Sequence, residues 1–383
     1  MTIEAKLLVD AAVAETGLDD FGGATYREGL DRLCAALADE SDLTELGEMV
    51  TAHRLTRLLV SRLRIEATYR EHPEIAEQQV VAPIFILGLP RTGTTATSQL
   101  LAMDPQIRSL RLWESSAPVP PPETATEQTD PRIAETEKGL QAMYTAFPRM
   151  TTLYFQTATG PTECQDLLGM EFRAHHFDGL AHVRSYVDWV VDCDMLPAYQ
   201  YHRRTLQLLQ WRCPPNTWHL KTPVHMLSMD ALDAVYPDAR FVWTHRDPAA
   251  VLGSVCDLIS YTRSWVSDRD DSAEIGNQQL RIWTTALRRA MEFRERVGEN
   301  RFADIRLEEI GADPVGAFER AYADIGLEMT GDAQAAIAQW AAEHPRSARG
   351  AHEYDIGEYR LDPAEVRREF AFYLDRFDVR PEG

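Results

Sequence analysis

The sequence from Val81 to Leu87, Val-Ala-Pro-Ile-Phe-Ile-Leu, runs directly into Gly88 to Thr95, Gly-Leu-Pro-Arg-Thr-Gly-Thr-Thr. The first part is a short apolar run rich in residues that favour strands, and it predicts a buried β-strand. The second part is a glycine loop, and residues 96–103 after it predict a helix. A strand, a glycine loop and a helix in this order form the repeating unit of a parallel α/β sheet.

Two segments downstream repeat the pattern of a strand that ends in polar residues. Residues 217–220 predict a strand that leads into Lys221-Thr-Pro223, and residues 240–244 predict one that leads into His245-Arg-Asp-Pro248. A fourth short strand is expected over 302–307. The sequence therefore predicts an α/β fold, a P-loop-type parallel sheet flanked by helices.

Helical patterns surround these strands on both sides. Apolar residues recur at helical spacing before the first strand, at Tyr26, Leu30, Leu33, Leu37, Leu55, Leu58, Leu59 and Leu63, and Asp42-Leu-Thr-Glu45 is a candidate capping box. Further helices are predicted over 196–211, 226–235, 248–261 and 278–297, and Asp247 and Pro248 suit the N-cap and first position of the third. We expect a helical N-terminal extension over 1–79, packed on the core, and an α/β domain over 80–383.

Two segments near the ends of the domain carry clear local signals. Residues 117–131 hold five prolines and predict an irregular surface loop or lid. Asp362-Pro-Ala-Glu365 has an N-cap residue followed by proline and predicts the start of a helical C-terminal segment. Val366, Phe370, Tyr373 and Phe377 would form the apolar face of that helix.

Composition excludes several classes of protein. The 383 residues include 39 basic and 60 acidic ones, and the net charge of −21 argues against a nucleic-acid binder or an anionic-membrane binder. The longest apolar stretch, at about 80–90, is too short to span a bilayer, and the first residues do not form a secretory signal, so we expect a cytoplasmic protein without a transmembrane segment. The five cysteines are scattered without a CxxC pair, so neither a metal site nor a disulfide framework is expected.

The glycine loop has the spacing of a phosphate loop, with one informative difference. Gly88-x4-Gly93 is followed by Thr94 and Thr95, whereas a nucleoside-triphosphate loop has lysine at the position of Thr94. The backbone N–H groups of such a loop converge on an anion at a helix N-terminus. Arg91 is the cation of the loop, which predicts an anion other than a metal-bound triphosphate. A P-loop kinase or ATPase remains an alternative.

Two cations stand at the ends of the other predicted strands. Arg246 offers a planar fork that suits a phosphate, and ligands of open α/β sheets bind at the carboxyl ends of strands. Lys221 is one of only three lysines in the chain, and an ammonium group acts as a compact point charge toward a single oxygen. A structural ion pair for Arg246 and a solvated surface position for Lys221 are the plainer alternatives.

Together these motifs resemble the sulfotransferases that use 3′-phosphoadenosine-5′-phosphosulfate (PAPS). The family has a P-[KR]-[ST]-G-T-T loop, an arginine and a serine eight residues apart, and a Lys-Thr or Lys-Ser-Pro element between them. The bacterial, actinobacterial-type branch is the most similar, and its motifs are matched here by Gly88-Leu-Pro-Arg-Thr-Gly-Thr-Thr95, Trp113-Glu114, Leu206-Gln-Leu-Leu-Gln-Trp211, Trp218-His-Leu-Lys-Thr-Pro-Val-His225, Tyr236-Pro-Asp-Ala239 and His245-Arg-Asp-Pro248. The resemblance runs from about residue 80 to the end of the chain.

The resemblance implies roles for individual residues. PAPS would be the cofactor, with its 5′-phosphosulfate held by Arg91, Thr92, Gly93, Thr94 and Thr95. Arg246 and Ser254 would hold the 3′-phosphate, and Lys221 would stabilise the leaving bridging oxygen. The eukaryotic cytosolic branch has tryptophan at the position of Ala96 and a further Arg-Lys-Gly element. Arg349-Gly350 is the candidate substitute for that element in this chain.

The acceptor would be a hydroxyl of a small molecule or glycolipid, and its deprotonation calls for a general base. Glu114, 21 residues after Gly93, is the favoured candidate, and His225, four residues after Lys221, is the other. A salt-bridged or helix-capping carboxylate and a core histidine are their structural alternatives. Glu163, His175 and His176 could line the acceptor site, although a structural reading is favoured for each.

Two matters stay open at this point. The protein could be a monomer or a homodimer. A non-catalytic nucleotide-binding protein of the same fold would carry most of the same loop residues.

Overall fold

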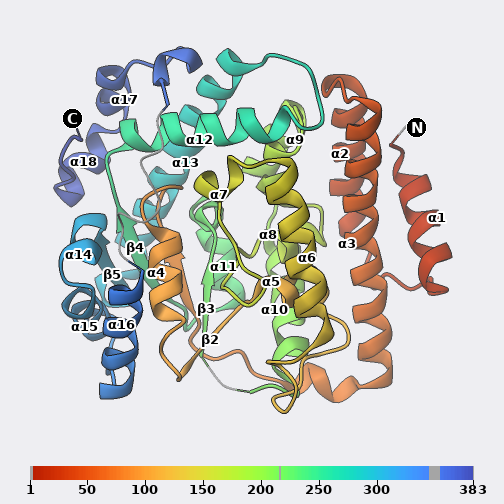
Figure 1. Ribbon diagram of the computed structural model, residues 1–383, viewed down its shortest axis with the longest axis horizontal. Helices are drawn as coiled ribbons and strands as arrows, with labels where there is room; N and C mark the ends of the chain where they lie inside the picture. The colour runs from red at the N-terminus through yellow and green to blue at the C-terminus, as the bar shows by residue number, and fades with distance from the viewer. Residues whose placement is uncertain (1–2, 215–216, 345–353, 383) are drawn as a thin grey trace.

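The computed structural model describes residues 3–214, 217–344 and 354–382, and its centre is a five-stranded parallel sheet (Figure 1). The strand order is β2-β3-β1-β4-β5. The strands are β1 (Ile84–Leu87), β2 (Ile107–Ser109), β3 (Thr217–Lys221), β4 (Arg240–His245) and β5 (Phe302–Arg306). The predicted α/β class with a parallel sheet and flanking helices is confirmed.

The register of the three inner strands brings their carboxyl ends to one edge. Ile86 of β1 pairs with Lys221 of β3 on one side and with Val242 of β4 on the other. The glycine loop after β1, Lys221 and Arg246 therefore emerge from the same edge of the sheet. This is the edge at which parallel α/β sheets bind ligands.

Alternate residues of β1 face two different layers of helices. Ile84 and Ile86 belong to a small apolar cluster with α4 (Thr94–Leu101), α14 (Leu307–Ala312), α15 (Pro314–Asp324) and α16 (Gly331–Glu343). Phe85 and Leu87 belong to a much larger cluster that reaches the N-terminal helices. Besides those, it includes residues of α8 (Gln165–Gly169), α9 (Arg184–Asp192), α10 (Leu196–Gln210), α11 (Met229–Val235), α12 (Pro248–Arg263), α13 (Ser272–Val297), α17 (Pro363–Glu369) and α18 (Ala371–Phe377).

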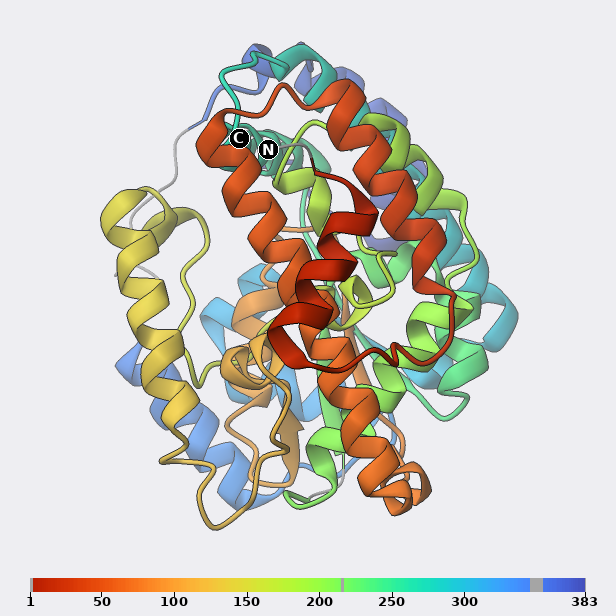
Figure 2. The same cartoon turned by 90° about the vertical axis from the view of Figure 1, so that its right-hand side faces the viewer.

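The N-terminal helices α1 (Ala5–Thr16), α2 (Tyr26–Glu40) and α3 (Glu45–Glu71) stand on the right of Figure 1. Figure 2 shows α1 outermost, lying across α3. The apolar residues predicted to recur at helical spacing in this region are all buried. Thr44, rather than Asp42, caps α3, because its hydroxyl accepts a hydrogen bond from the Gly47 N–H at 3.0 Å.

A small third cluster lies over the loop edge of the sheet. It joins α6 (Pro131–Ala146) and α7 (Met150–Leu153) to Leu112 of α5 (Leu112–Ser116) and to Leu258 and Tyr261 of α12. Residues 117–130, between α5 and α6, form neither helix nor strand, as their prolines predict. The C-terminal segment begins at its predicted cap, Asp362, but breaks at Phe370 into two helices, α17 and α18.

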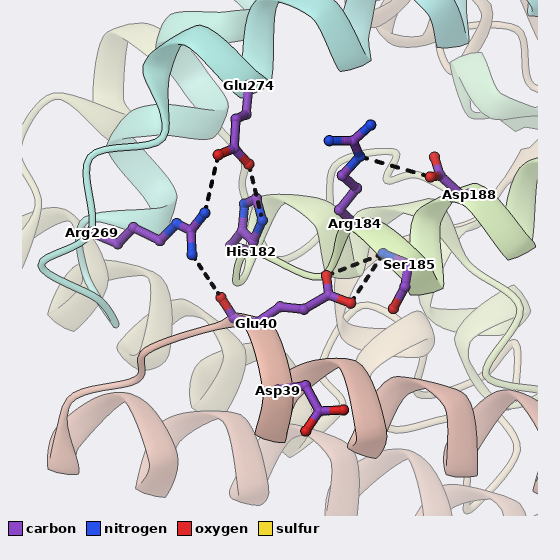
Figure 3. A pocket seen from close by; sticks show the side chains of 8 residues that line it. All are labelled: Asp39, Glu40, His182, Arg184, Ser185, Asp188, Arg269 and Glu274. Carbon is purple, nitrogen blue, oxygen red and sulfur yellow. Dashed lines mark hydrogen bonds and ion pairs between the residues drawn. The ribbon is translucent and has the colours of Figure 1, made fainter.

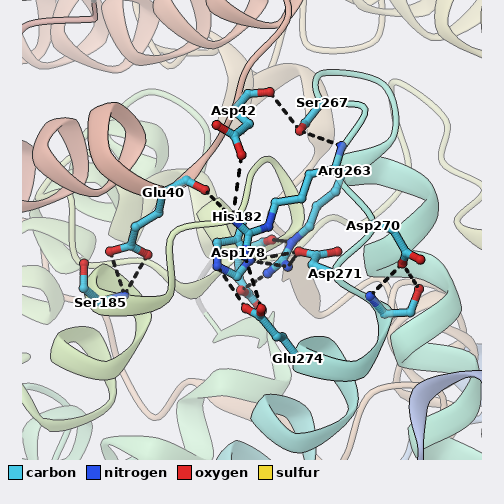
Figure 4. Close-up of polar contacts among 12 residues, drawn as sticks. Glu40, Asp42, Asp178, His182, Ser185, Arg263, Ser267, Asp270, Asp271 and Glu274 are labelled. Carbon is cyan, nitrogen blue, oxygen red and sulfur yellow. Dashed lines mark hydrogen bonds and ion pairs between the residues drawn. The ribbon is translucent and has the colours of Figure 1, made fainter.

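A buried polar network ties α12 to the segments around it (Figure 4). The Arg263 guanidinium donates to Asp178 Oδ1 at 2.6 Å and also contacts Asp271, while His182 Nδ1 lies 2.9 Å from Asp271 Oδ2. Outside this network is a pocket of about 380 Å³ lined by charged side chains (Figure 3). The Glu40 carboxylate accepts from the Ser185 N–H at 3.1 Å, and Arg269 pairs with Glu274 and donates to the Glu40 carbonyl at 3.4 Å. These groups therefore link the end of α2 to α9 and to the start of α13.

Short 3₁₀ helices complete the connections, at η1 (Pro73–Glu77), η2 (His175–Gly179), η3 (Pro223–Leu227), η4 (Glu299–Arg301) and η6 (Ile356–Tyr359). Within the described ranges, no helix is both long enough and apolar enough to cross a membrane.

Candidate active site

The backbone of the glycine loop needs glycine at both of its ends. Gly88 has φ +134° and a Cβ there would lie 2.7 Å from the carbonyl oxygen of Thr244, so no other residue fits. Gly93 has φ +94° and is the N-cap of α4. Arg91 also has a positive φ, +66°, which costs a residue with a side chain about 1–2 kcal/mol and is a frequent feature of functional loops.

The loop turns its N–H groups toward the N-terminus of α4. The helix ladder begins with the Thr97 N–H donating to the Gly93 carbonyl, so the N–H groups of Thr94 and Thr95 have no acceptor within the helix. These groups and the helix dipole favour an anion at this point. Thr92 has a different role, because its hydroxyl lies 2.6 Å from both the Leu89 carbonyl and the Thr244 hydroxyl and thereby fixes the loop on β4.

Arg91 is a largely buried cation, and within the described part of the chain its hydrogen bonds go to uncharged groups. Its Nε donates to the Ser254 hydroxyl at 3.1 Å, and its Nη1 donates to the Leu153 carbonyl at 2.6 Å. Burial, and then the positive charge of Arg246, lower the pKa of Arg91 below its usual value. An anion beside Arg91 would relieve both effects, which is the electrostatic signature of an anion site.

Arg246 lies next to Arg91 and faces a carboxylate. Its Nη1 donates to the Arg91 carbonyl at 3.0 Å, while its Nε and Nη2 each lie 2.7 Å from an oxygen of Glu382. The hydrogen bonds from Arg246 to Glu382 raise the pKa of Arg246. Asp247, the next residue, caps α12 as predicted, with its carboxylate accepting from the Ala249 N–H at 3.0 Å.

Lys221 is buried at the end of β3 and pairs with Glu163. The Lys221 Nζ donates to Glu163 Oε1 at 2.8 Å, and the Thr222 hydroxyl donates to Glu163 Oε2 at 3.0 Å. The Lys221 side chain is 2% exposed and that of Glu163 is 18% exposed, so the carboxylate is the more accessible partner. Burial and the Glu163 carboxylate hold the pKa of Tyr154 well above its usual value, which places this phenol beside the pair.

The contacts of Glu114 are those of a carboxylate that stabilises the fold. Its side chain is fully buried, and its Oε1 accepts from Arg108 Nη2 at 2.6 Å and from Arg111 Nη2 at 2.7 Å. Its Oε2 accepts from the Arg111 N–H at 3.2 Å, which makes it the N3 member of a capping box at α5. Of its two sequence-based readings, the geometry favours the salt-bridged, helix-capping carboxylate over a base available to an acceptor.

His225 lies in the aromatic core beneath the sheet. It is fully buried, its Nδ1 lies 2.8 Å from the Tyr199 hydroxyl, and its ring packs edge-on to Phe85 at 4.9 Å between centroids. Phe85 faces the large cluster rather than the loop. Burial holds the pKa of His225 well below its usual value, so the ring is neutral. This geometry favours the core reading of His225.

The other site residues considered from the sequence fall into two groups, those at the loop edge of the sheet and those that lie elsewhere. Arg91, Ser254 and Arg246 lie in one continuous contact network, and Lys221 lies at the same sheet edge. Glu163 is the residue whose place the sequence did not reveal, because it precedes Lys221 by 58 residues and no spacing rule links them. His175 and His176 both lie in η2, and desolvation lowers the pKa of each, while Arg349 falls outside the described residues.

Comparisons with known proteins identify the family and the fold of the chain. A family model described as the sulfotransferase family matches residues 83–331. The structure is similar to sulfotransferase STF9 from Mycobacterium avium, with a TM-score of 0.93 and 33% identity over 100% of this chain and 98% of that one. It is also similar to sulfotransferase STF1 from Mycobacterium tuberculosis H37Rv, with a TM-score of 0.87 and 32% identity over 97% and 99% of the two chains.

A curated relative from Mycobacterium bovis, Omega-hydroxy-beta-dihydromenaquinone-9 sulfotransferase Stf3, is 29% identical over 109 residues. That match covers 28% of this chain and 28% of the relative.

Proposed function

Because the chain belongs to the sulfotransferase family, we propose that it transfers a sulfuryl group from PAPS to a hydroxyl of a small-molecule acceptor. The observation that carries the proposal is the charge at the loop edge of the sheet. Arg91 is desolvated beside a second arginine, and within the described residues its hydrogen bonds go to uncharged groups. Beside it, the N–H groups at the start of α4 have no acceptor within that helix. A ligand with two separated anionic groups fits this pair of arginines.

The residues present fit the two ends of PAPS. Arg91, Thr95 and the backbone N–H groups of Gly93 and Thr94 would hold the 5′-phosphosulfate at the helix N-terminus. Arg246 and Ser254 would hold the 3′-phosphate, because a guanidinium group can bind two phosphate oxygens at once. Thr92 would act indirectly by fixing the loop on β4. When bound, PAPS supplies the activated sulfuryl group.

Lys221 would stabilise the bridging oxygen as negative charge develops on it. The ammonium group stands at the end of β3, whose register places it beside the end of β1 and the loop. A preorganised charge in a buried site needs no reorganisation during the reaction, and one such group typically contributes about 10²–10³ in rate. Turning Lys221 toward the donor would also loosen its contact with Glu163.

We assign the general base to Glu163 in place of Glu114 and His225. Glu163 lies 2.8 Å from Lys221 and keeps 18% of its side chain exposed, whereas Glu114 and His225 are fully buried and engaged elsewhere. In this scheme Glu163 accepts the proton of the acceptor hydroxyl while the hydroxyl oxygen bonds to sulfur and the bond from sulfur to the bridging oxygen breaks.

The surroundings of Glu163 favour an acceptor with an apolar body. The third cluster, formed by α6, α7 and parts of α5 and α12, ends at Leu153 and Tyr154. The Leu153 carbonyl accepts a hydrogen bond from Arg91, and Tyr154 is beside Glu163, so this apolar cluster adjoins both halves of the site. The name of the Stf3 relative refers to a hydroxylated menaquinone, a molecule of this kind.

Calorimetry with adenosine 3′,5′-bisphosphate, the product of PAPS, tests the assignment. We expect it to bind more tightly than adenosine 5′-monophosphate, and Arg246→Ala to remove most of that difference, a loss of about 10–100-fold. Magnesium-dependent ATP hydrolysis without any preference for the 3′-phosphorylated nucleotide would contradict the proposal and favour a P-loop kinase or ATPase.

A further inference from the structure

Glu382 occupies the guanidinium face that a phosphate would use. Its two carboxylate oxygens each lie 2.7 Å from Arg246, one from Nε and one from Nη2. This two-oxygen, two-nitrogen geometry is the same that arginine offers to a phosphate group. The pair is only partly exposed, at 25% for the Arg246 side chain and 36% for that of Glu382, so solvent screens it incompletely.

The backbone of Glu382 is held independently of its side chain. The Glu382 N–H donates to Asp247 Oδ2 at 2.9 Å, and the Glu382 carbonyl accepts from Arg367 Nη2 at 2.6 Å. Arg367 Nη2 also donates to Asp247 Oδ2 at 2.7 Å, and the Asp247 side chain is fully buried. The carboxylate can therefore rotate away from Arg246 while the chain stays docked beside it.

We propose that Glu382 is an internal competitor for the 3′-phosphate, which rests on the proposed function of Arg246. Without nucleotide, the Glu382 carboxylate neutralises Arg246 and spares the site two adjacent uncompensated guanidinium groups. When nucleotide binds, the 3′-phosphate displaces the carboxylate, because it carries more charge and can also reach Ser254. A tethered competitor multiplies the affinity of the free site by the fraction of time for which it leaves the site open, and so lowers the apparent affinity.

Only a ligand with a 3′-phosphate should be affected by this competition. Adenosine 5′-monophosphate can occupy the loop without displacing Glu382. The side chain of Glu382 therefore reduces the difference in affinity between nucleotides with and without a 3′-phosphate, and it slows the binding of the 3′-phosphorylated ones.

Calorimetry on the full chain with both nucleotides tests the proposal, with Glu382→Gln as the variant. Glutamine keeps the size of the side chain and removes its charge. We expect the affinity for adenosine 3′,5′-bisphosphate to rise roughly tenfold, with its apparent association rate rising by a similar factor, because the competing charge-assisted pair is lost. The affinity for adenosine 5′-monophosphate should change less than about twofold. Glu365→Gln is the matched control, since Glu365 forms an exposed pair with Arg368 on the nearby α17, and it should leave both affinities unchanged.

Two results would overturn the proposal while leaving the proposed function intact. One is an unchanged affinity of Glu382→Gln for the bisphosphate, provided that its thermal unfolding matches the wild type. The other is a rise that is equal for both nucleotides. A wild-type protein that does not prefer the bisphosphate would instead contradict the assignment of Arg246 itself.

Discussion

Glu114 and Glu163 carry the same functional group, and each lies against basic side chains, yet their surroundings suit different roles. Glu114 is sealed between Arg108 and Arg111 and also caps a helix. Glu163 shares its proton-accepting oxygens with Lys221 and Thr222 and remains partly exposed. A carboxylate must be reachable by a substrate oxygen to act as a base, and Glu163 meets this requirement.

The first prediction separates these two carboxylates. Glu163→Gln should lower kcat by about 10²–10⁴ while leaving the affinity for adenosine 3′,5′-bisphosphate within about twofold, because only the proton acceptor is lost. Glu114→Gln should lower the free energy of unfolding by about 3 kcal/mol, because the buried Arg108 loses its counter-charge and Arg111 keeps only Glu127, but the folded variant should keep its turnover. Steady-state kinetics and urea unfolding measure the two effects. A folded but inactive Glu114→Gln beside a normal Glu163→Gln would return the role of base to Glu114.

Among single residues, the sequence predicted the positions of the three cations better than that of Glu163, the carboxylate we propose as the base. Arg91, Lys221 and Arg246 follow predicted strands directly, so parallel topology alone brings them to one edge. Glu163 comes from an irregular segment before α8, and its approach to Lys221 depends on tertiary packing. Glu382 is still more distant from its partner along the chain, at 136 residues from Arg246, compared with 58 residues between Glu163 and Lys221.

The loop between β1 and α4 shows how one short element depends on its neighbour. Its shape is held by the contact of Thr92 with Thr244 on β4, and its first residue, Gly88, lies against the backbone of the same threonine. The loop can therefore keep its conformation only while β1 and β4 stay paired.

The second prediction concerns this element. Gly88→Ala should lower the free energy of unfolding by about 3 kcal/mol and abolish nucleotide binding, because φ +134° is unsuited to alanine and its Cβ would meet the Thr244 carbonyl at 2.7 Å. Gly139→Ala is the control, since Gly139 lies within α6 with no atom near its missing Cβ. This change should raise stability by up to about 1 kcal/mol, because alanine favours helix. Equal effects of the two substitutions in thermal unfolding would argue against the strain at Gly88.

Elements with strong local signals were predicted well, and those that depend on tertiary contacts were not. The caps at Asp247 and Asp362 are confirmed, as are the strands that carry the site. β2 is a three-residue edge strand with no pattern of its own, and it forms because β3 offers it a partner. The break at Phe370 has a similar origin, since Phe370 is fully buried in the core between α17 and α18.

Over the whole molecule, the two faces of the sheet differ in what they bury. The face of Phe85 holds His202 and His225, which burial keeps neutral, while His219 pairs with Ile84 and lies on the opposite face, where the apolar cluster is largely aliphatic. His219, on β3, is bound on both ring nitrogens by the hydroxyls of Ser98 and Ser109. Burial lowers the pKa of both His202 and His219 to about 3.

The third prediction follows from these histidines. The unfolded chain takes up their protons near pH 6.5, whereas the folded chain does so only near pH 3, so the folded state loses stability as the pH falls through this window. Between pH 7.5 and 5.5 each of the two should lower the free energy of unfolding by about 1.4 kcal/mol. Acidification also reduces the net charge of −21, which acts in the opposite direction.

A pair of variants isolates the contribution of the buried histidine. His219→Gln should make the decline in stability between pH 7.5 and 5.5 shallower by about 1.4 kcal/mol, because one proton uptake is removed. His53→Gln, at an exposed position on α3, should leave the decline unchanged. Urea unfolding at both pH values gives the measurement, and equal slopes for His219→Gln and the wild type would contradict the assignment.

The pairing of Lys221 with Glu163 has a practical consequence for following the protein in solution. The chain has three lysines, and the other two, Lys6 and Lys138, are exposed. Growth on lysine labelled at Cε alone would thus yield a nuclear magnetic resonance spectrum with three side-chain carbon signals, two of them from the exposed residues. The third signal would come from Lys221 and would report on the proposed active site without overlap at every step of a titration.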